Sequence, residues 1–125
     1  MEIRFTKREL DIMGTLWTHG PSTVGEVRDA LEDDLAYNTV LTMLKVMERK
    51  GYVSRNRERR AHRYTAEVER VAAGRSALSR VTERLFAGSP EELLLHLVDS
   101  GLDPDALRRM RDLLDQRLRD MEDDQ

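Results

Sequence analysis

The sequence predicts a mainly helical protein with one small β-hairpin, because three patterns recur along its 125 residues. Apolar residues repeat at helical spacing over most of the chain. Helix-start signals, in which a Ser, Thr or Asp precedes a Pro or Glu, introduce four of these segments. Between residues 53 and 65 the period falls to about two, which is typical of paired strands. Hydrophobic residues make up 39% and charged residues 36%, a composition typical of a folded chain.

A first helix is predicted to begin after Thr6. Thr6 and Glu9 have the spacing of a capping box, and Phe5 is placed to pack on Leu10 in the first turn. Gly20-Pro21 ends this helix. Its apolar face is predicted to consist of Leu10, Met13, Leu16 and Trp17.

A short second helix and a longer third helix follow. Thr23 and Glu26 repeat the capping pattern, and the second helix carries an apolar stripe of Val24, Val27 and Leu31. The third helix runs from about residue 37 to residue 50, where Gly51 terminates it. Its core face is predicted to be Val40, Met43, Leu44 and Met47. The opposite face carries Asn38, Thr42, Lys45 and Arg49.

Positive charge is concentrated in the predicted hairpin and the helix before it. From Lys45 to Arg63 there are eight Lys or Arg and two Glu, a local charge of +6, so the other 106 residues carry −9 to reach the net −3. Five arginines belong to the hairpin: Arg55, Arg57, Arg59, Arg60 and Arg63. Such charge can simply discourage an edge strand from pairing with other chains. The three helices that precede it favour contact with DNA instead.

Three helices followed by a basic hairpin is the order of a winged helix-turn-helix domain. In that fold the third helix enters the major groove, and the hairpin, called the wing, lies on the phosphate backbone. Base contacts are predicted for Asn38, Thr42 and Lys45, because Asn suits adenine and Thr can meet a thymine methyl. Contacts to the DNA backbone are predicted for Tyr37, Arg49, Arg55, Arg57, Arg59, Arg60 and Arg63.

The C-terminal half is predicted to form three more helices. The first covers about residues 67–86, and Ser89-Pro90 and Asp103-Pro104 open the other two. One short helix is apolar on nearly every side, and the last has apolar residues close to heptad spacing. Dimerisation is therefore predicted through Leu93, Leu94, Leu97, Leu107, Met110, Leu114 and Leu118. A bundle that packs on the winged domain of the same chain is the alternative. The expected domains are residues 1–66, for DNA binding, and 67–125, for dimerisation.

Enzymatic and metal functions find no support in the sequence. Nucleophile, phosphate-loop and metalloprotease motifs are absent, and the chain has no cysteine. His19, His62 and His96 are far apart in the chain, so no metal or other cofactor is expected. No targeting segment or membrane span is predicted, and the lack of cysteine suits a reducing cytoplasm.

The chain resembles the BlaI/MecI family of bacterial penicillinase repressors, which includes CopY-type regulators. Residues 10–17 resemble the first helix of that family. Residues 37–42 with Leu44, and residues 50–53, resemble its most distinctive segment, and residues 60–64 the second wing strand. The resemblance implies a bacterial homodimeric repressor bound to a palindromic operator. Thiolate copper sensing, known in CopY-type members, is excluded here because cysteine is absent.

The resemblance also implies a mode of release. Family members that respond to β-lactam antibiotics are inactivated by a sensor protease, at a bond that corresponds here to His96-Leu97. These residues differ from the usual Asn-Phe pair of the family. Cleavage there would weaken the dimer and, through lost avidity, the operator complex. Two other hypotheses are a protein-interaction module and a winged-helix regulator that responds to a small molecule, similar to the MarR type.

Overall fold

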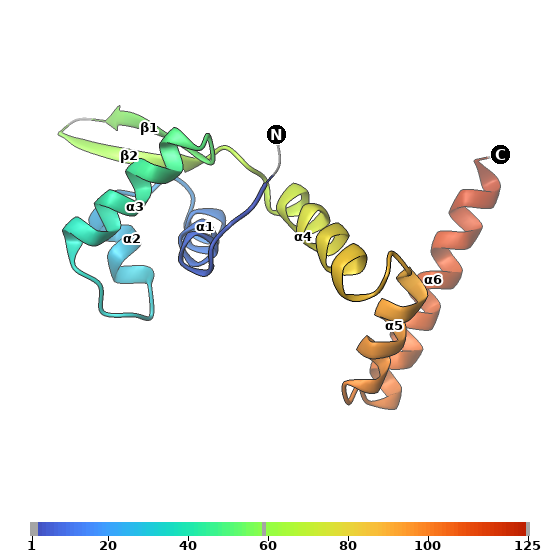
Figure 1. Cartoon of the computed structure of the whole chain (residues 1–125). Coiled ribbons are helices and arrows are strands. Elements are labelled where there is room, and N and C mark those ends of the chain that lie inside the picture. Colours follow the sequence, from blue (N-terminus) through green and yellow to red (C-terminus); the bar gives the residue numbers. More distant parts are fainter. Residues whose placement is uncertain (1–2, 59, 125) are drawn as a thin grey trace. The chain divides into compact units, whose positions relative to one another are not determined.

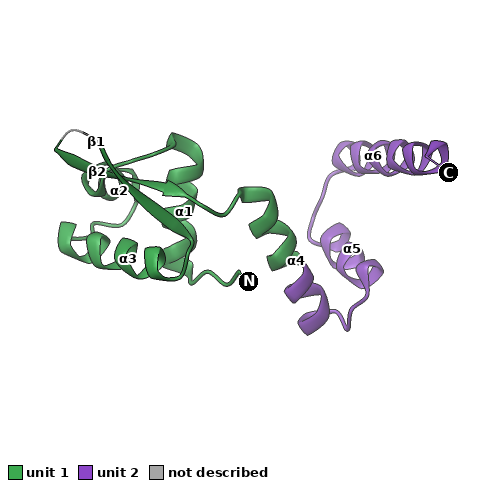
Figure 2. Cartoon of the chain, turned by 90° about the horizontal axis from the view of Figure 1, so that it is seen from above, with its two compact units in different colours: residues 1–78 green, residues 79–125 purple. Residues whose placement is uncertain are grey.

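The computed structural model describes residues 3–58 and 60–124. Along the chain the elements are α1 (Lys7–His19), α2 (Val24–Ala30), α3 (Tyr37–Arg49), β1 (Val53–Glu58), β2 (Ala61–Ala66), α4 (Arg70–Leu85), α5 (Pro90–Asp99) and α6 (Pro104–Asp123) (Figure 1). The predicted fold class, helices with one hairpin in winged helix-turn-helix order, is confirmed. Residues 1–78 and 79–125 form two compact units, and the border between them falls within α4 (Figure 2).

The predicted helix-start signals are confirmed by hydrogen bonds. In α1 the Thr6 hydroxyl accepts a bond from the Glu9 amide at 3.1 Å, and the Glu9 carboxylate accepts one from the Thr6 amide at 2.8 Å. Thr23 and Glu26 make the same pair of bonds at the start of α2. Ser89 and Asp103 cap α5 and α6, each with a proline in the first turn.

The hydrophobic core lies in the first unit. Its buried apolar side chains are Ile12, Met13, Leu16, Val24, Val27, Val40, Leu44, Met47, Tyr52, Val53, Tyr64, Val68 and Ala73. They come from α1, α2, α3, the hairpin and the first turn of α4, together with Tyr52 just before β1 and Val68 just before α4. Three of the four predicted core residues of α3 are fully buried, whereas Met43 is half-buried at the edge of the core.

The predicted buried face of α1 was partly wrong. Leu10 is 49% exposed, and Ile12 is fully buried in its place. The buried residues of α1 are Glu9, Ile12, Met13 and Leu16, at helical spacings 0, 3, 4 and 7. Phe5, predicted to pack on Leu10, makes edge-on ring contacts with Trp17 and Tyr52.

The hairpin pairs β1 with β2 in an antiparallel register from Val53↔Ala66 to Glu58↔Ala61. Gly51 precedes it with a φ of 82°, a left-handed conformation that favours glycine and ends α3 as predicted. At the other edge, Tyr64 of β2 forms a backbone bridge with Ser22 in the connection between α1 and α2. The hairpin is therefore attached to the helices on both sides.

The second unit contains the end of α4 together with α5 and α6. None of the described residues 79–124 is buried. The ring of Phe86 lies 4.8 Å from the ring of His96, which links the start of this unit to α5. No helix in the described part of the chain has the length and apolar character needed to cross a bilayer.

Candidate nucleic-acid interface

The outward face of α3 presents the residues predicted to read bases. Asn38, Thr42, Lys45 and Arg49 are all exposed, while Val40 and Leu44 hold the opposite face in the core. The Thr42 hydroxyl donates a hydrogen bond to the Asn38 carbonyl at 2.9 Å. That bond uses the only hydroxyl proton of Thr42 and leaves its oxygen lone pairs available as acceptors. The amide of Asn38 is the residue of this face best suited to a bidentate contact with adenine.

The start of α3 differs from the starts of α1 and α2. Its N-cap residue is Ala36, which makes no side-chain capping bond. First-turn amides of α3 therefore lack the side-chain acceptor that Thr6 and Thr23 supply in the other two helices. Tyr37, predicted to contact a phosphate, is 46% exposed, and the guanidinium of Arg28 lies 6.0 Å from its ring centre.

The end of α3 is held by the buried carboxylate of Glu9, for which only a capping role at the start of α1 was predicted. Glu9 is 5% exposed, and its Oε2 lies 2.8 Å from Nζ of Lys50, the C-cap residue of α3. Burial alone would raise the pKa of Glu9. The hydrogen bonds from Lys50 and Thr6 outweigh it, so the pKa lies below its usual value. The start of α1 is thus tied to the end of α3.

The register of the hairpin sorts its arginines between two faces. Directly paired residues share a face, so Arg55 and Arg57 lie with Tyr64 and His62 on one side. The pair Asn56↔Arg63 lies on the other side. Nε of Arg55 is 3.7 Å from the Glu48 carboxylate, so the first face is turned toward α3. Arg59 lies outside the described residues.

The hydroxyl of Tyr64, the residue that pairs with Arg55 in the hairpin, is fully buried. It has no hydrogen-bond partner among the described residues. Burial raises the pKa of Tyr64, and the nearby charge of Glu48 adds to the increase although Arg55 opposes it. The ring of Tyr64 fills the space between the hairpin and the helices, which identifies it as a core residue.

Ion pairs divide the basic residues into two groups. Lys50, Arg55 and Arg63 are paired with Glu9, Glu48 and Glu26, respectively. Within the residues that the structure describes, no ion pair engages the exposed side chains of Lys45, Arg49, Arg57 and Arg60. These four cations are available to phosphates without first breaking a bond to a carboxylate.

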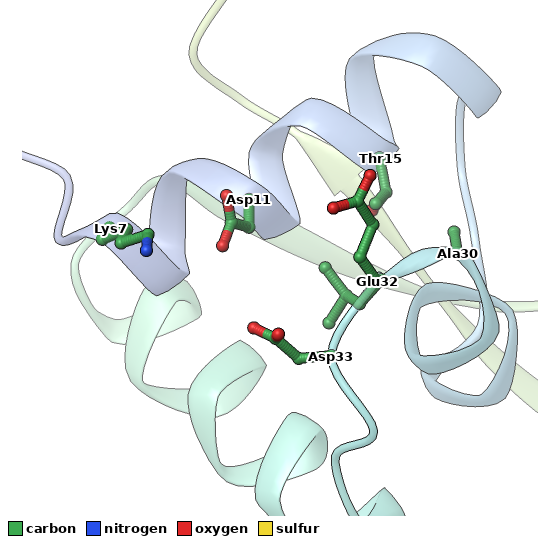
Figure 3. A pocket seen from close by; sticks show the side chains of 7 residues that line it. Lys7, Asp11, Thr15, Ala30, Glu32 and Asp33 are labelled. Atoms are coloured by element: carbon green, nitrogen blue, oxygen red, sulfur yellow. The ribbon is translucent and has the colours of Figure 1, made fainter.

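A pocket between α1 and the turn after α2 is not suited to DNA. It is lined by Lys7, Asp11, Thr15, Ala30, Leu31, Glu32 and Asp33. In Figure 3, Asp11 and Thr15 of α1 lie opposite Glu32 and Asp33. Three carboxylates against one amine give this surface a negative charge, which repels phosphate. The pocket is therefore separate from the candidate interface.

The residues predicted to form the dimer are gathered in the second unit and are not covered within it. Leu94, Leu97, Leu114 and Leu118 are 40%, 47%, 52% and 56% exposed. Leu93, Leu107 and Met110 are half-buried. His96 and Leu97, the predicted cleavage position, lie inside α5, and His96 Nδ1 is 2.9 Å from the Glu92 carbonyl.

Comparison with known proteins identifies a family and relatives that this chain resembles. A family model described as penicillinase repressor matches residues 5–116. The transcriptional regulator BlaI of Mycobacterium tuberculosis, found in two strains, is 39% identical over 108 residues, which covers 81% of this chain and 78% of that protein. The crystal structure of the transcriptional regulator Tm0710 from Thermotoga maritima aligns with a TM-score of 0.51 and 25% identity, over 96% of this chain and 78% of that one.

Proposed function

The chain belongs to the penicillinase repressor family, whose members are transcriptional repressors and not enzymes, and from this premise we propose that it represses transcription by binding a palindromic DNA operator as a homodimer. The observation that carries the proposal is the exposed polar face of α3 beside hairpin cations that, among the described residues, form no ion pair. α3 and β1 pack against each other, so both elements can approach one duplex (Figure 1).

In this proposal the side chains have two kinds of role. Asn38, Thr42 and Lys45 read base edges in the major groove, where each base pair offers a distinct pattern of donors and acceptors. Tyr37 and the cations of α3 and the wing bind phosphates, which sets register and makes affinity depend on salt. The chromosome is the target of such a repressor, so we place the protein in the bacterial cytoplasm.

The second unit supports the homodimer. Most of its leucines on α5 and α6 are exposed in the single chain, and exposed large apolar side chains in such number are typical of a protein interface. A dimer holds two winged domains together, so the two half-sites of a palindrome are bound with avidity. The domain division at residue 66, with DNA binding before it and dimerisation after it, is part of this proposal. Val68 and Ala73 of the following segment also pack in the core of the first unit.

Release by proteolysis is a further part of the proposal and rests on the family relationship. The bond between His96 and Leu97 lies within α5, so a protease would have to unwind that helix before cleavage. Cleavage would separate Leu93 and Leu94 of α5 from Leu97 and from the apolar residues of α6, and so weaken the dimer. A test is to follow the intact chain in cells of its own organism before and after β-lactam treatment. Persistence of full-length protein while target genes are derepressed would overturn this part alone.

The DNA-binding proposal is tested by selecting duplexes from a random library with the purified protein at physiological salt. Recovery of a palindrome with half-sites about one helical turn, roughly 10 base pairs, apart is expected. A single half-site would contradict the dimer. No enrichment would contradict sequence-specific binding and favour the protein-interaction alternative.

Variants then distinguish residues that recognise bases from residues that bind phosphates. Arg57→Ala and Arg60→Ala should weaken binding to every sequence and reduce the salt slope by about 0.9 for each phosphate that is no longer bound. Asn38→Ala should instead change the preferred base at one position. Arg109→Ala is the matched control, since it removes one exposed positive charge from α6, outside the proposed interface. Equal decreases in affinity for Arg57→Ala and Arg109→Ala would contradict the assignment of the wing.

A further inference from the structure

The strand β2 is joined to the segment that precedes α2 by two backbone hydrogen bonds. The Ser22 amide donates to the Tyr64 carbonyl at 3.0 Å, and the Tyr64 amide donates to the Ser22 carbonyl at 2.8 Å. Ser22 is 5% exposed, and its hydroxyl donates to the Gly20 carbonyl at 2.8 Å. This joint attaches the base of the wing to the turn from which α2 begins.

Arg63 extends the same joint with its side chain. Its Nη1 lies 2.7 Å from Oε1 of Glu26 and 3.4 Å from the carbonyl oxygen of Pro21. The Glu26 carboxylate is oriented in advance, because its Oε1 also accepts a bond from the Thr23 amide at 3.0 Å in the capping box of α2. The bonds from Thr23 and the charge of Arg63 lower the pKa of Glu26, so the carboxylate is ionised at neutral pH.

The surroundings of Arg63 differ from those of the wing-tip cations. Arg57 and Arg60 are exposed and, among the described residues, carry no ion pair, whereas Arg63 is turned toward α2 and is 35% exposed. Arg63 also lies on the face of the hairpin opposite Arg55 and Arg57. To bind a phosphate, Arg63 would have to break its contacts with the Glu26 carboxylate and the Pro21 carbonyl oxygen.

We propose that Arg63 is a positioning residue that sets the angle of the wing against α2 through Glu26, and that it does not itself hold a DNA phosphate. This proposal rests on the proposed DNA-binding function and reassigns one of the seven residues predicted to contact the DNA backbone. α3 packs against both α2 and β1 of the wing. The Arg63–Glu26 ion pair between the wing and α2 therefore fixes the distance from the wing arginines to the phosphates when α3 lies in the groove. A wing ordered before binding loses less conformational entropy when the complex forms.

The two roles predict opposite effects for Glu26. If Arg63 gripped a phosphate, the carboxylate of Glu26 would compete with the DNA, and its removal would raise affinity and steepen the salt dependence. If Arg63 positions the wing, removal of the carboxylate breaks the Arg63–Glu26 ion pair and lowers operator affinity. The number of bound phosphates stays the same, so the slope of affinity against salt concentration is unchanged.

The test measures operator affinity of the full-length protein between 50 and 200 mM salt, a range over which phosphate binding is resolved, on the duplex recovered from the library. Glu26→Gln keeps an oxygen for the Thr23 amide and removes only the charge. Glu26→Gln and Arg63→Gln are each expected to lower affinity by about two- to fivefold per half-site, the range of an exposed ion pair, with the slope of wild type. The double variant should be no weaker than Arg63→Gln, because both changes break one interaction.

Asp29→Asn is the matched control, since it removes one negative charge from the same helix without a link to the wing. It should leave affinity unchanged or raise it slightly. A thermal melt of each variant checks that the fold is retained. Two results would overturn the positioning role. One is that Glu26→Gln binds the operator more tightly than Asp29→Asn does. The other is that Arg63→Gln reduces the slope of affinity against salt as much as Arg57→Gln does. Failure of wild type to bind any duplex would instead overturn the proposed function.

Discussion

The two compact units of this chain are built from similar helices but differ in what their apolar side chains contact. In residues 1–78, α1, α2, α3 and the hairpin enclose a common core in which seven large side chains, Tyr64, Ile12, Met13, Leu44, Met47, Val27 and Val40, are fully buried. In the described residues 79–124, no side chain is buried, although α5 and α6 have well-formed caps. Caps and periodicity therefore produce helices in both units, but among the described residues only those of the first unit enclose a buried apolar core.

The difference separates two sources of stability. A core closed within one chain has the same stability at any protein concentration. A surface closed by a second copy depends on concentration, because folding and association are then linked. The first unit suits a DNA-binding element that must keep its geometry with or without DNA. The second unit suits an element whose assembly controls avidity.

The largest expected effect comes from the apolar face of α6. Leu114→Glu together with Leu118→Glu should convert the proposed dimer to monomer, because a carboxylate cannot be buried there without a partner. Operator affinity should fall by about 10²- to 10⁴-fold through lost avidity. Size-exclusion chromatography with light scattering gives the mass, and a binding titration gives the affinity. Glutamate is a good helix former, so α6 itself is expected to persist.

Gln116→Glu is the matched control for that pair. Gln116 lies between the two leucines in sequence but about half a turn away around α6, and it is exposed. This variant should remain dimeric with affinity close to wild type. If the wild-type protein were monomeric at micromolar concentration, the apolar side chains of the second unit would not be covered by a second copy, and the proposed difference between the two units would be wrong.

The next effect compares the same truncation in both units. Leu44→Ala should destabilise the first unit by about 2–5 kcal/mol, since it leaves a cavity in a closed core. Leu114→Ala should cost stability only to the extent that the dimer forms. Denaturant unfolding at two protein concentrations distinguishes them, because the destabilisation by Leu44→Ala should not vary with concentration. A concentration-dependent effect at Leu44 would show that the first unit also relies on a partner.

The smallest effect concerns the charge pairs. Glu9→Gln should destabilise the first unit at neutral pH by about 1–3 kcal/mol, because the buried carboxylate accepts bonds from Lys50 and Thr6. The pKa of Glu9 is lowered in the folded state, so this contribution is present above the unfolded pKa, near 4.5, and is lost as pH falls through the lower folded value. The difference in the free energy of unfolding between wild type and Glu9→Gln should therefore decrease as the pH is lowered.

Asp105→Asn provides the corresponding change in the second unit. Asp105 pairs with Arg108, but both side chains are largely exposed, so no measurable destabilisation is expected at any pH. Thermal melts from pH 7 to pH 3 compare the two variants. A pH-independent difference between wild type and Glu9→Gln would show that the ion pair with Lys50 does not stabilise the fold.

Much of the fold was predictable because its signals are local. Thr6 with Glu9, and Thr23 with Glu26, identify helix starts from residues three apart, and Gly51 marks the end of α3. The core face of α3 follows from spacing alone, except at Met43 on its margin. The misassignment of Leu10 and Ile12 had a different origin. The charged Glu9 lies on the buried face of α1, where it pairs with Lys50, a residue 41 positions away in the sequence.

The positions of the α3 residues and of the described hairpin arginines were also predictable, but their ion-pair partners were not. Charge and period placed the arginines on a hairpin next to α3. Which of them carry a carboxylate partner depends on Glu26 and Glu48, which no pattern along the chain connects to Arg63 and Arg55. The sequence alone therefore does not distinguish the hairpin arginines from one another.

By itself, the sequence determined the order of the helices and hairpin, their caps and the concentration of positive charge after α3, because each depends on neighbours within a few residues. Only the tertiary structure decided that Glu9 is buried against Lys50, that Arg63 is held by Glu26, and that most leucines of α5 and α6 stay exposed in the single chain. The physical reason is that burial and ion pairing depend on distances between elements far apart in the sequence, and those distances exist only after the core has packed.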